Sequence, residues 1–201
     1  MQPNILLADD HSIVRKGLRL ICELSGYSEI EEVGSCNELM KELACKKYSH
    51  LVLDMFLTDG NSLEILPTIR SVYPDLKIMI FSMQPPEVYG KVIKQFGIWN
   101  FISKANPEEE TIRILNKFLR DEQPARSNFD TQDAGNPFSD LSSREMEVLH
   151  HMLKGIGTKE ISDNLNLKHN TVSTFKNRIY EKTQTANINE LLELARLYKV
   201  T

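Results

Sequence analysis

The 201-residue sequence has no apolar run long enough to span a bilayer, and it has few cysteines. A membrane-spanning helix needs about 20 consecutive apolar residues, so we expect no transmembrane segment. Cys22, Cys36 and Cys45 are odd in number and form no Cys-x-x-Cys pair, which favours reduced thiols over a disulfide framework or a metal site. The start, Met1-Gln2-Pro3-Asn4, also lacks the basic and apolar regions of a signal peptide. We therefore expect a cytoplasmic protein that has no membrane partner.

The sequence also lacks a large excess of charge of either sign. Its net charge of -4 excludes a protein that binds polyanions by bulk charge alone. Residues 1–120 hold 14 Lys/Arg and 16 Asp/Glu, residues 121–137 hold 1 and 4, and residues 138–201 hold 9 and 8. The last segment is the least acidic, and this permits nucleic-acid binding there.

Short apolar runs alternate with amphipathic segments through residues 1–120. The apolar runs predict strands that are followed in each case by a helix with one apolar face. We expect these strands near residues 4–8, 30–34, 49–54, 77–82 and 99–102. Five successive strand–helix pairs predict an α/β fold with a doubly wound, five-stranded parallel sheet.

Polar residues stand where four of these strands end. Asp9 and Asp10 follow the first strand, Asp54 the third, Ser82 the fourth and Lys104 the fifth. In open α/β sheets ligands bind beyond the carboxyl ends of the strands, so we expect these side chains to meet. Three neighbouring carboxylates repel one another, and a hard divalent cation such as Mg²⁺ relieves the repulsion. Each residue alone is ordinary in a turn or cap, but together they indicate a site for a phosphoryl group on Asp54.

At this point the sequence resembles a known family. The segments Leu-Leu-Ala-Asp-Asp and Leu-Val-Leu-Asp-Met, together with Ser82, Phe101 and Lys104, are similar to the receiver domain of two-component response regulators. The resemblance implies that Asp54 accepts a phosphoryl group from a histidine kinase. It further implies that Lys104 pairs with the acyl phosphate, that Ser82 moves toward it, and that Phe101 changes rotamer as part of a two-state switch.

The resemblance also implies a magnesium site. Asp10, Asp54 and the backbone carbonyl of Phe56 would bind Mg²⁺ directly, and Asp9 would bind it through water. The family often has a cis peptide bond after its lysine. We expect a cis bond between Lys104 and Ala105, although a cis bond before a non-proline residue costs about 3 kcal/mol.

Three positions depart from the usual pattern of the family. Thr58 stands where the family usually has proline, and Ser62 and Asn100 stand where it usually has glycine. We therefore expect a loop after Asp54 with a shape of its own.

Residues 121–137 are polar and acidic, and they contain Pro124, Gly135 and Pro137. This composition predicts a linker between a first domain, residues 1–120, and a second domain, residues 138–201.

The second domain begins with Ser142 and Glu145 at the spacing of a capping box. A short helix capped by Thr158 and a longer one capped by Asn170 are expected to follow. Two helices joined by a four-residue turn have the spacing of a helix-turn-helix, and we expect a small all-α, four-helix domain.

The longer helix carries polar and basic side chains on one face. Such side chains read base edges and pair with phosphates, although a solvated face of a helical bundle has the same pattern. The candidates are Thr171, Ser173, Thr174, Lys176, Asn177, Arg178 and Lys182.

The amino-acid sequence of this segment resembles the LuxR-type DNA-binding domain. The matching stretches are Leu-Ser-Ser-Arg-Glu-Met-Glu-Val-Leu, Gly-Ile-Gly-Thr-Lys-Glu-Ile-Ser-Asp-Asn-Leu and Asn-Thr-Val-Ser-Thr-Phe-Lys-Asn-Arg-Ile-Tyr-Glu-Lys. With the first domain, the chain resembles NarL/FixJ-family response regulators. The resemblance implies that Ser173, Thr174, Lys176 and Asn177 face the major groove.

The resemblance has two further implications for this domain. Thr171, Arg178 and Lys182 would approach DNA phosphates. The last helix would pair two copies, with Leu191, Leu192, Ala195 and Tyr198 as candidates, and the alternative that Leu191 or Leu192 fills the domain's own core stays open. Ser173 replaces the usual lysine and Phe175 a frequent histidine, so we expect weaker phosphate or guanine contacts there.

The sequence thus predicts a transcription regulator that binds double-stranded DNA as a homodimer when Asp54 is phosphorylated. We expect no enzyme activity beyond the gain and loss of this phosphoryl group. A phosphatase of the haloacid-dehalogenase type is disfavoured because it needs a second aspartate two residues on, where Phe56 stands. The departures at Thr58 and Ser62 leave open a regulator that binds DNA without being phosphorylated.

Overall fold

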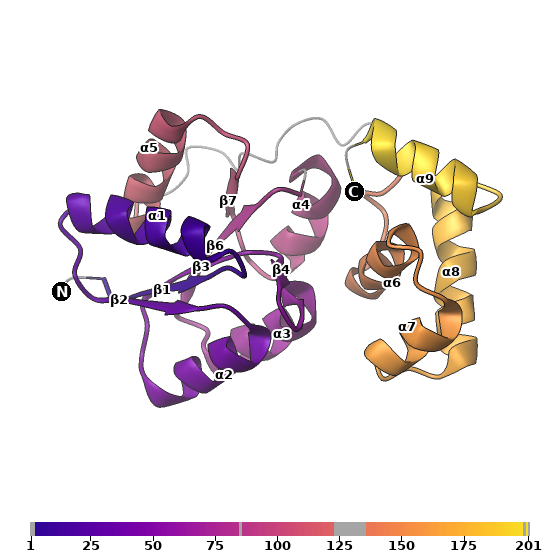
Figure 1. Ribbon diagram of the computed structural model, residues 1–201, viewed down its shortest axis with the longest axis horizontal. Coiled ribbons are helices and arrows are strands. Elements are labelled where there is room, and N and C mark those ends of the chain that lie inside the picture. Colours follow the sequence, from indigo (N-terminus) through magenta and orange to yellow (C-terminus); the bar gives the residue numbers. More distant parts are fainter. Residues whose placement is uncertain (1–2, 85, 123–135, 199, 201) are drawn as a thin grey trace. The chain divides into compact units, whose positions relative to one another are not determined.

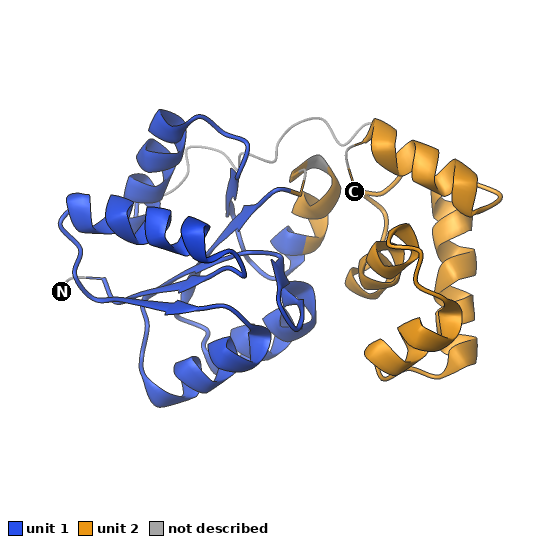
Figure 2. Cartoon of the chain, viewed as in Figure 1, with its two compact units in different colours: residues 1–83, 93–130 blue, residues 84–92, 131–201 orange. Residues whose placement is uncertain are grey.

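The computed structural model describes residues 3–84, 86–122, 136–198 and 200. The chain divides into two compact units (Figure 2). Unit 1 comprises Met1–Met83 and Ile93–Asp130, and unit 2 comprises Gln84–Val92 and Thr131–Thr201. Most of the predicted linker, residues 121–137, lies outside the described residues. Within the described residues, no helix combines the length and apolar character that crossing a membrane requires.

Unit 1 contains a five-stranded parallel sheet. Its strands are β1 (Ile5–Ala8), β2 (Ile30–Val33), β3 (His50–Leu53), β6 (Lys77–Ser82) and β7 (Asn100–Ser103). They lie in the order β2-β1-β3-β6-β7, and every neighbouring pair is parallel. Every residue of β1 and β3 is buried because the central strands of such a sheet are covered on both faces.

Helices cover both faces of this sheet (Figure 1). Helices α1 (Ser12–Leu24) and α5 (Glu108–Leu119) lie on one face, and α2 (Cys36–Cys45) and α3 (Ser62–Val72) lie on the other. Helix α4 (Pro86–Gln95) joins β6 to β7. The predicted doubly wound α/β fold is confirmed.

The loop after β3 folds into a small hairpin that the sequence did not predict. Its antiparallel strands are β4 (Phe56–Leu57) and β5 (Gly60–Asn61). The side chain of Asn61 then caps α3 by accepting a hydrogen bond from the Leu63 amide at 2.9 Å. Helix α3 therefore starts directly at the end of the hairpin.

Unit 2 contains four further helices, as predicted. They are α6 (Ser143–Leu153), α7 (Thr158–Asn164), α8 (His169–Thr183) and α9 (Ile188–Leu197). The capping box is confirmed, since Ser142 Oγ accepts from the Glu145 amide and Glu145 Oε2 accepts from the Ser142 amide. The other two predicted caps are wrong: Thr158 and Asn170 lie inside helices that follow Gly157 and Lys168, neither of which has a side-chain cap bond.

Candidate phosphoacceptor site and nucleic-acid interface

The carboxyl edge of the sheet brings together the residues that the strand ends predicted. Asp9 follows β1, Asp54 follows β3, Ser82 ends β6 and Lys104 follows β7. Because β1, β3, β6 and β7 are adjacent and parallel, their ends meet at one edge. Asp9, Asp54 and Ser82 are buried, so this is a poorly solvated polar site.

The ammonium group of Lys104 links two of the carboxylates. Its Nζ lies 2.6 Å from Asp54 Oδ2 and 2.7 Å from Asp9 Oδ2. The Lys104 amide also donates to the Ser82 carbonyl at 2.9 Å, which continues the β6–β7 pairing to the edge of the site. Among the described residues no peptide bond is cis, so the predicted cis bond between Lys104 and Ala105 is wrong. The side chain reaches both acids with a trans bond.

The ionisation of these groups is perturbed by burial. Burial raises the pKa of Asp54; hydrogen bonds from Lys104 and Ser82 act in the opposite direction but do not outweigh it, and the neighbouring Asp9 raises it further. Burial acts to lower the pKa of Lys104, but its contacts with Asp54 and Asp9 outweigh this and raise it. The lysine is thus held in its charged form beside an acid that burial makes harder to ionise.

The residues present fit a hard divalent cation. Asp9, Asp10, His11 and Asp54 each offer an atom, and these atoms all lie within 4.8 Å of one another. Asp9 Oδ2 and Asp10 Oδ1 are buried and accept no well-aligned hydrogen bond, although Lys104 Nζ and His11 Nδ1 lie within ion-pair distance of them. Several carboxylate oxygens this close together suit a divalent cation that prefers oxygen ligands.

Two groups at this site were missed by reasoning from the sequence. The Met55 amide donates to Asp54 Oδ1 at 2.6 Å, and His11 Nδ1 lies 2.5 Å from Asp10 Oδ1. The adjacency of His11 to the acidic pair was a visible signal, whereas the Met55 contact involves only the backbone. Two further predicted residues lie nearby in the sequence or the core. Phe101 is buried in β7. Phe56 is the first residue of β4 and follows Asp54 by two positions.

In unit 2, the predicted DNA-binding residues lie on α8. Thr171, Thr174 and Arg178 line a hollow of about 290 Å³ together with Asn170 and Phe175. Ser173 and Asn177, two of the residues predicted to read bases, belong to the same helix.

Two lysines of α8 are already engaged within the unit. Lys176 Nζ donates to Thr158 Oγ1 at 3.0 Å. Lys182 Nζ lies 2.7 Å from Glu145 Oε2 and donates to the Asp140 carbonyl at 3.0 Å. Lys182 thereby compensates a buried carboxylate, which the sequence did not predict.

Helix α9 contains the residues predicted to pair two copies. Leu191 and Ala195 have no exposed surface, whereas Leu192 and Tyr198 are partly exposed. Helix α9 packs against α6, and Leu191 is fully buried. Leu191 therefore fills the domain's own core, which was the alternative left open by the sequence.

Family models match both the parallel-sheet domain and the four-helix domain of this chain. The model for the response regulator receiver domain matches residues 5–116, and the model for bacterial regulatory proteins of the luxR family matches residues 139–195. The first match covers all five strands of the parallel sheet, and the second covers α6 to α8 and most of α9.

Similar proteins match over nearly their whole length. The chain is 26% identical to the transcription regulator BvgA of Bordetella pertussis, over 98% of each chain. It is also 26% identical to the response regulator UvrY of Escherichia coli K12, over 96% of this chain and 93% of that one. The structure of RcsB from Salmonella enterica serovar Typhimurium, solved with promoter DNA, has the same fold with a TM-score of 0.81 at 22% identity, over 96% and 98% of the two chains. The chain therefore belongs to the two-component response regulators of the NarL/FixJ type, with a receiver domain and a LuxR-type DNA-binding domain.

Proposed function

We propose that the protein is a transcription regulator switched by phosphorylation of Asp54. A histidine kinase would supply the phosphoryl group. The bond between phosphorus and a histidine nitrogen breaks, the nitrogen keeps the electron pair, and phosphorus forms a bond to an oxygen of the Asp54 carboxylate. The observation that carries the proposal is Lys104 Nζ, which lies 2.6 Å from Asp54 and 2.7 Å from Asp9. A cation at this distance from the acceptor can neutralise charge on the phosphoryl oxygens.

We propose that Mg²⁺ binds among Asp9, Asp10 and Asp54. The support is the donor set of three carboxylates, with the backbone carbonyl of Phe56 as the proposed fourth contribution. When bound, Mg²⁺ supplies positive charge that offsets the repulsion between the Asp54 carboxylate and an incoming phosphoryl group. The hydroxyl of Ser82 hydrogen-bonds to Asp54 and would donate to an oxygen of the phosphoryl group once Asp54 carries it.

The chemistry at this site is limited, in our proposal, to the gain and loss of the protein's own phosphoryl group. Hydrolysis of a separate phosphorylated substrate would call for a second acid near Asp54 to protonate a leaving group. The position two residues on is Phe56, and the nearby acids Asp9 and Asp10 belong to the proposed metal site. Water would return Asp54 to its free form.

The output we propose is binding of a homodimer to double-stranded DNA through α8. Support comes from the RcsB structures, which include a complex with promoter DNA in the presence of phosphomimetic BeF3- and two dimers bound to two parallel DNAs. The exposed Thr174, Asn177 and Arg178 side chains of α8 are of the types that contact bases and phosphates.

Incubation with acetyl phosphate and Mg²⁺ tests the phosphoacceptor. We expect the wild type to gain the mass of one phosphoryl group and the Asp54→Asn variant to gain none. Intact-mass spectrometry measures both, and omission of Mg²⁺ is the control for metal dependence. A wild type that gains no mass would instead support a regulator that binds DNA without phosphorylation, and an equal gain after Asp54→Asn would show that the phosphoacceptor is another residue.

A further inference from the structure

The hairpin that follows Asp54 is closed at its base by the backbone around Asp54. The Ser62 amide donates to the Met55 carbonyl at 2.8 Å, and the Ser62 hydroxyl donates to the Asp54 carbonyl. Strand pairing then places Phe56 opposite Asn61. The base of the hairpin is therefore fixed by hydrogen bonds to the backbone of Asp54 and Met55, and it contains the proposed Phe56 ligand.

The tip of the hairpin is held by a different part of the fold. The amide and the hydroxyl of Thr58 both donate to the Gly34 carbonyl, at 3.3 and 3.1 Å. Asp59 accepts from two amides in the first turn of α2, with 2.5 Å from Cys36 to Oδ1 and 3.0 Å from Asn37 to Oδ2. These four hydrogen bonds join segments 22 to 24 residues apart in the sequence.

The contacts of Asp59 are charge-assisted. A carboxylate at the start of a helix interacts favourably with the unpaired amides and the positive end of the helix dipole. The pKa of Asp59 is lowered accordingly, since the hydrogen bonds from Asn37 and Cys36 together outweigh the opposing effect of burial. The tip is thus held by its charge as well as by the hydroxyl of Thr58.

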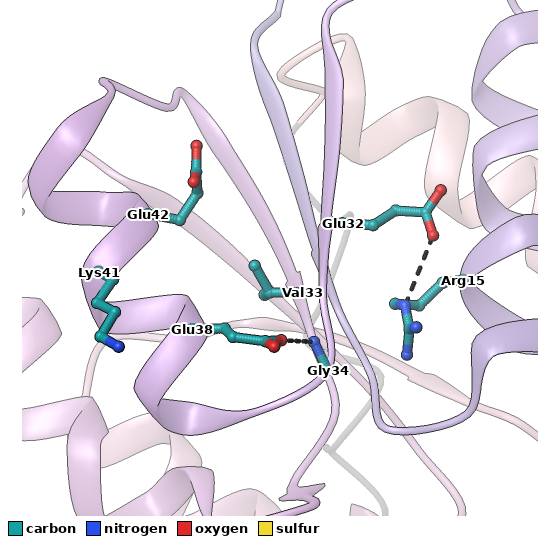
Figure 3. Close-up of a pocket in the computed structure, with 7 residues that line it drawn as sticks. All are labelled: Arg15, Glu32, Val33, Gly34, Glu38, Lys41 and Glu42. Atoms are coloured by element: carbon teal, nitrogen blue, oxygen red, sulfur yellow. Dashed lines mark hydrogen bonds and ion pairs between the residues drawn. The ribbon is translucent and has the colours of Figure 1, made fainter.

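The segment that receives the tip is itself fixed on both sides. Figure 3 shows Gly34 between Glu38, which accepts from the Gly34 amide at 2.7 Å, and Arg15. Arg15 Nη1 lies 3.4 Å from the point that a Cβ on Gly34 would occupy, and the same atom donates to the Asp9 carbonyl. The hairpin tip thus hydrogen-bonds to Gly34, and Arg15, whose side chain lies beside Gly34, donates to the backbone of Asp9, a proposed metal ligand.

We propose that Thr58 and Asp59 are positioning residues that hold the hairpin so that Asp54 and the Phe56 carbonyl face a shared Mg²⁺ ion. The inference rests on the proposed function of Asp54. Proline, which the family usually has where Thr58 stands, restricts the loop through its ring, whereas this chain restricts it through contacts with Gly34 and α2. Loss of these contacts would leave the ligands present but less well oriented.

The test uses the full-length variants Thr58→Val and Asp59→Ala, with Ser35→Ala as the matched control. Ser35 caps the same end of α2 by accepting from the Glu38 amide at 3.0 Å, and its hydroxyl forms no hydrogen bond with Thr58 or Asp59. Isothermal titration calorimetry would measure Mg²⁺ affinity, and hydrogen exchange would report protection of the Cys36 and Asn37 amides. Circular dichroism would confirm that each variant is folded.

We expect Thr58→Val and Asp59→Ala to weaken Mg²⁺ binding by about 10-fold, as is typical when the groups that orient a metal ligand are removed. The rate of phosphorylation by acetyl phosphate should fall at low Mg²⁺ and return to the wild-type rate at saturating Mg²⁺. Ser35→Ala should lower the stability of α2 and leave Mg²⁺ affinity unchanged.

Two results would overturn the inference while the proposed function stands. One is unchanged Mg²⁺ affinity in both hairpin variants, and the other is an equal loss in Ser35→Ala, which would assign the effect to the stability of α2. A wild type that binds no Mg²⁺ and accepts no phosphoryl group would overturn the inference together with the proposed function.

Discussion

The Asp54 carboxylate is held in an environment that opposes its charge. It is 6% exposed, and burial raises its pKa even though Lys104 contacts it. Asp9, which is 1% exposed, adds a second negative charge to the same site. Burial of these two carboxylates therefore opposes the stability of the fold, and such perturbed titratable groups are common at functional sites.

Replacing Asp54 by asparagine should stabilise unit 1 in the absence of divalent ions. A raised pKa in the folded state means that ionisation of Asp54 opposes folding at pH 7, and Lys104 keeps Asp9 as a partner after the substitution, so Asp54→Asn should raise the free energy of unfolding. The gain should shrink as the pH falls through the raised pKa, because the wild-type carboxyl then becomes neutral too.

Urea unfolding in EDTA, followed by the fluorescence of the single tryptophan, Trp99, measures this difference in unit 1. The exposed Asp75 provides a control, and Asp75→Asn should leave stability nearly unchanged. A wild type more stable than Asp54→Asn at pH 7 would contradict the expectation.

At the scale of the element, α8 divides its basic residues between two roles. Lys182 pairs with Glu145, a carboxylate with 2% of its surface exposed, and Lys176 donates to Thr158. Arg178 is exposed and makes no ion pair with any described residue. Of these three basic residues, Arg178 therefore has the fewest contacts to give up when it binds a ligand.

Arg178→Ala should reduce the salt dependence of DNA binding more than Lys182→Ala does. Loss of one phosphate contact lowers the slope of log K against log salt by about 0.9. We expect about this change for Arg178→Ala and a smaller one for Lys182→Ala, because Lys182 must leave Glu145 to reach a phosphate.

Fluorescence anisotropy with a labelled duplex over a series of salt concentrations measures both slopes. Arg196→Ala, which removes an exposed cation from α9 rather than α8, is the control. If Lys182→Ala lowered the slope relative to wild type as much as Arg178→Ala does, Lys182 would contact phosphate as freely as Arg178.

At the scale of the whole molecule, Asp121, which follows α5 closely, contacts the start of β3, the strand that precedes Asp54. His50, at the start of β3, is buried, and its Nε2 lies 3.1 Å from Asp121 Oδ1. Lys77, at the start of β6, pairs with the same oxygen. Asp121 has a φ of 61°, a left-handed conformation that these partners hold in place. Strand β3 thus begins at this anchor and is followed directly by Asp54, the proposed phosphoacceptor.

The stability of unit 1 should depend on His50 between neutral and mildly acidic pH. Burial lowers the pKa of His50 more than the contact with Asp121 raises it. Protonation is therefore harder in the folded state, and stability is lost as the pH falls from about 6.5 through the lowered pKa.

His50→Gln should flatten this dependence between about pH 7.5 and about pH 5.5, the range in which an ordinary histidine titrates. Urea unfolding followed by Trp99 fluorescence at several pH values gives the slope of the free energy of unfolding against pH for the wild type and for His50→Gln. Parallel slopes for wild type and variant would mean that His50 does not change its protonation on folding.

Much of the fold and part of the site could be predicted because their signals are local. Buried apolar runs before Asp9 and Asp54, Ile5–Ala8 and residues 51–53, indicate central strands of a parallel sheet, and such strands place the residue that follows them at one edge. The capping box joins Ser142 and Glu145, which are only three positions apart. The sequence by itself therefore determined the alternation of strands and helices, the four-helix second domain and the members of the acidic cluster.

Only the tertiary structure decided how those residues are held. The contacts of Asp59 with the start of α2 and of Lys182 with Glu145 join residues at least 22 positions apart. No periodicity or short motif encodes such a pairing, because its geometry depends on how several elements pack at once. The trans bond after Lys104 belongs to the same class, since the reach of that side chain depends on where β1 and β3 end relative to β7.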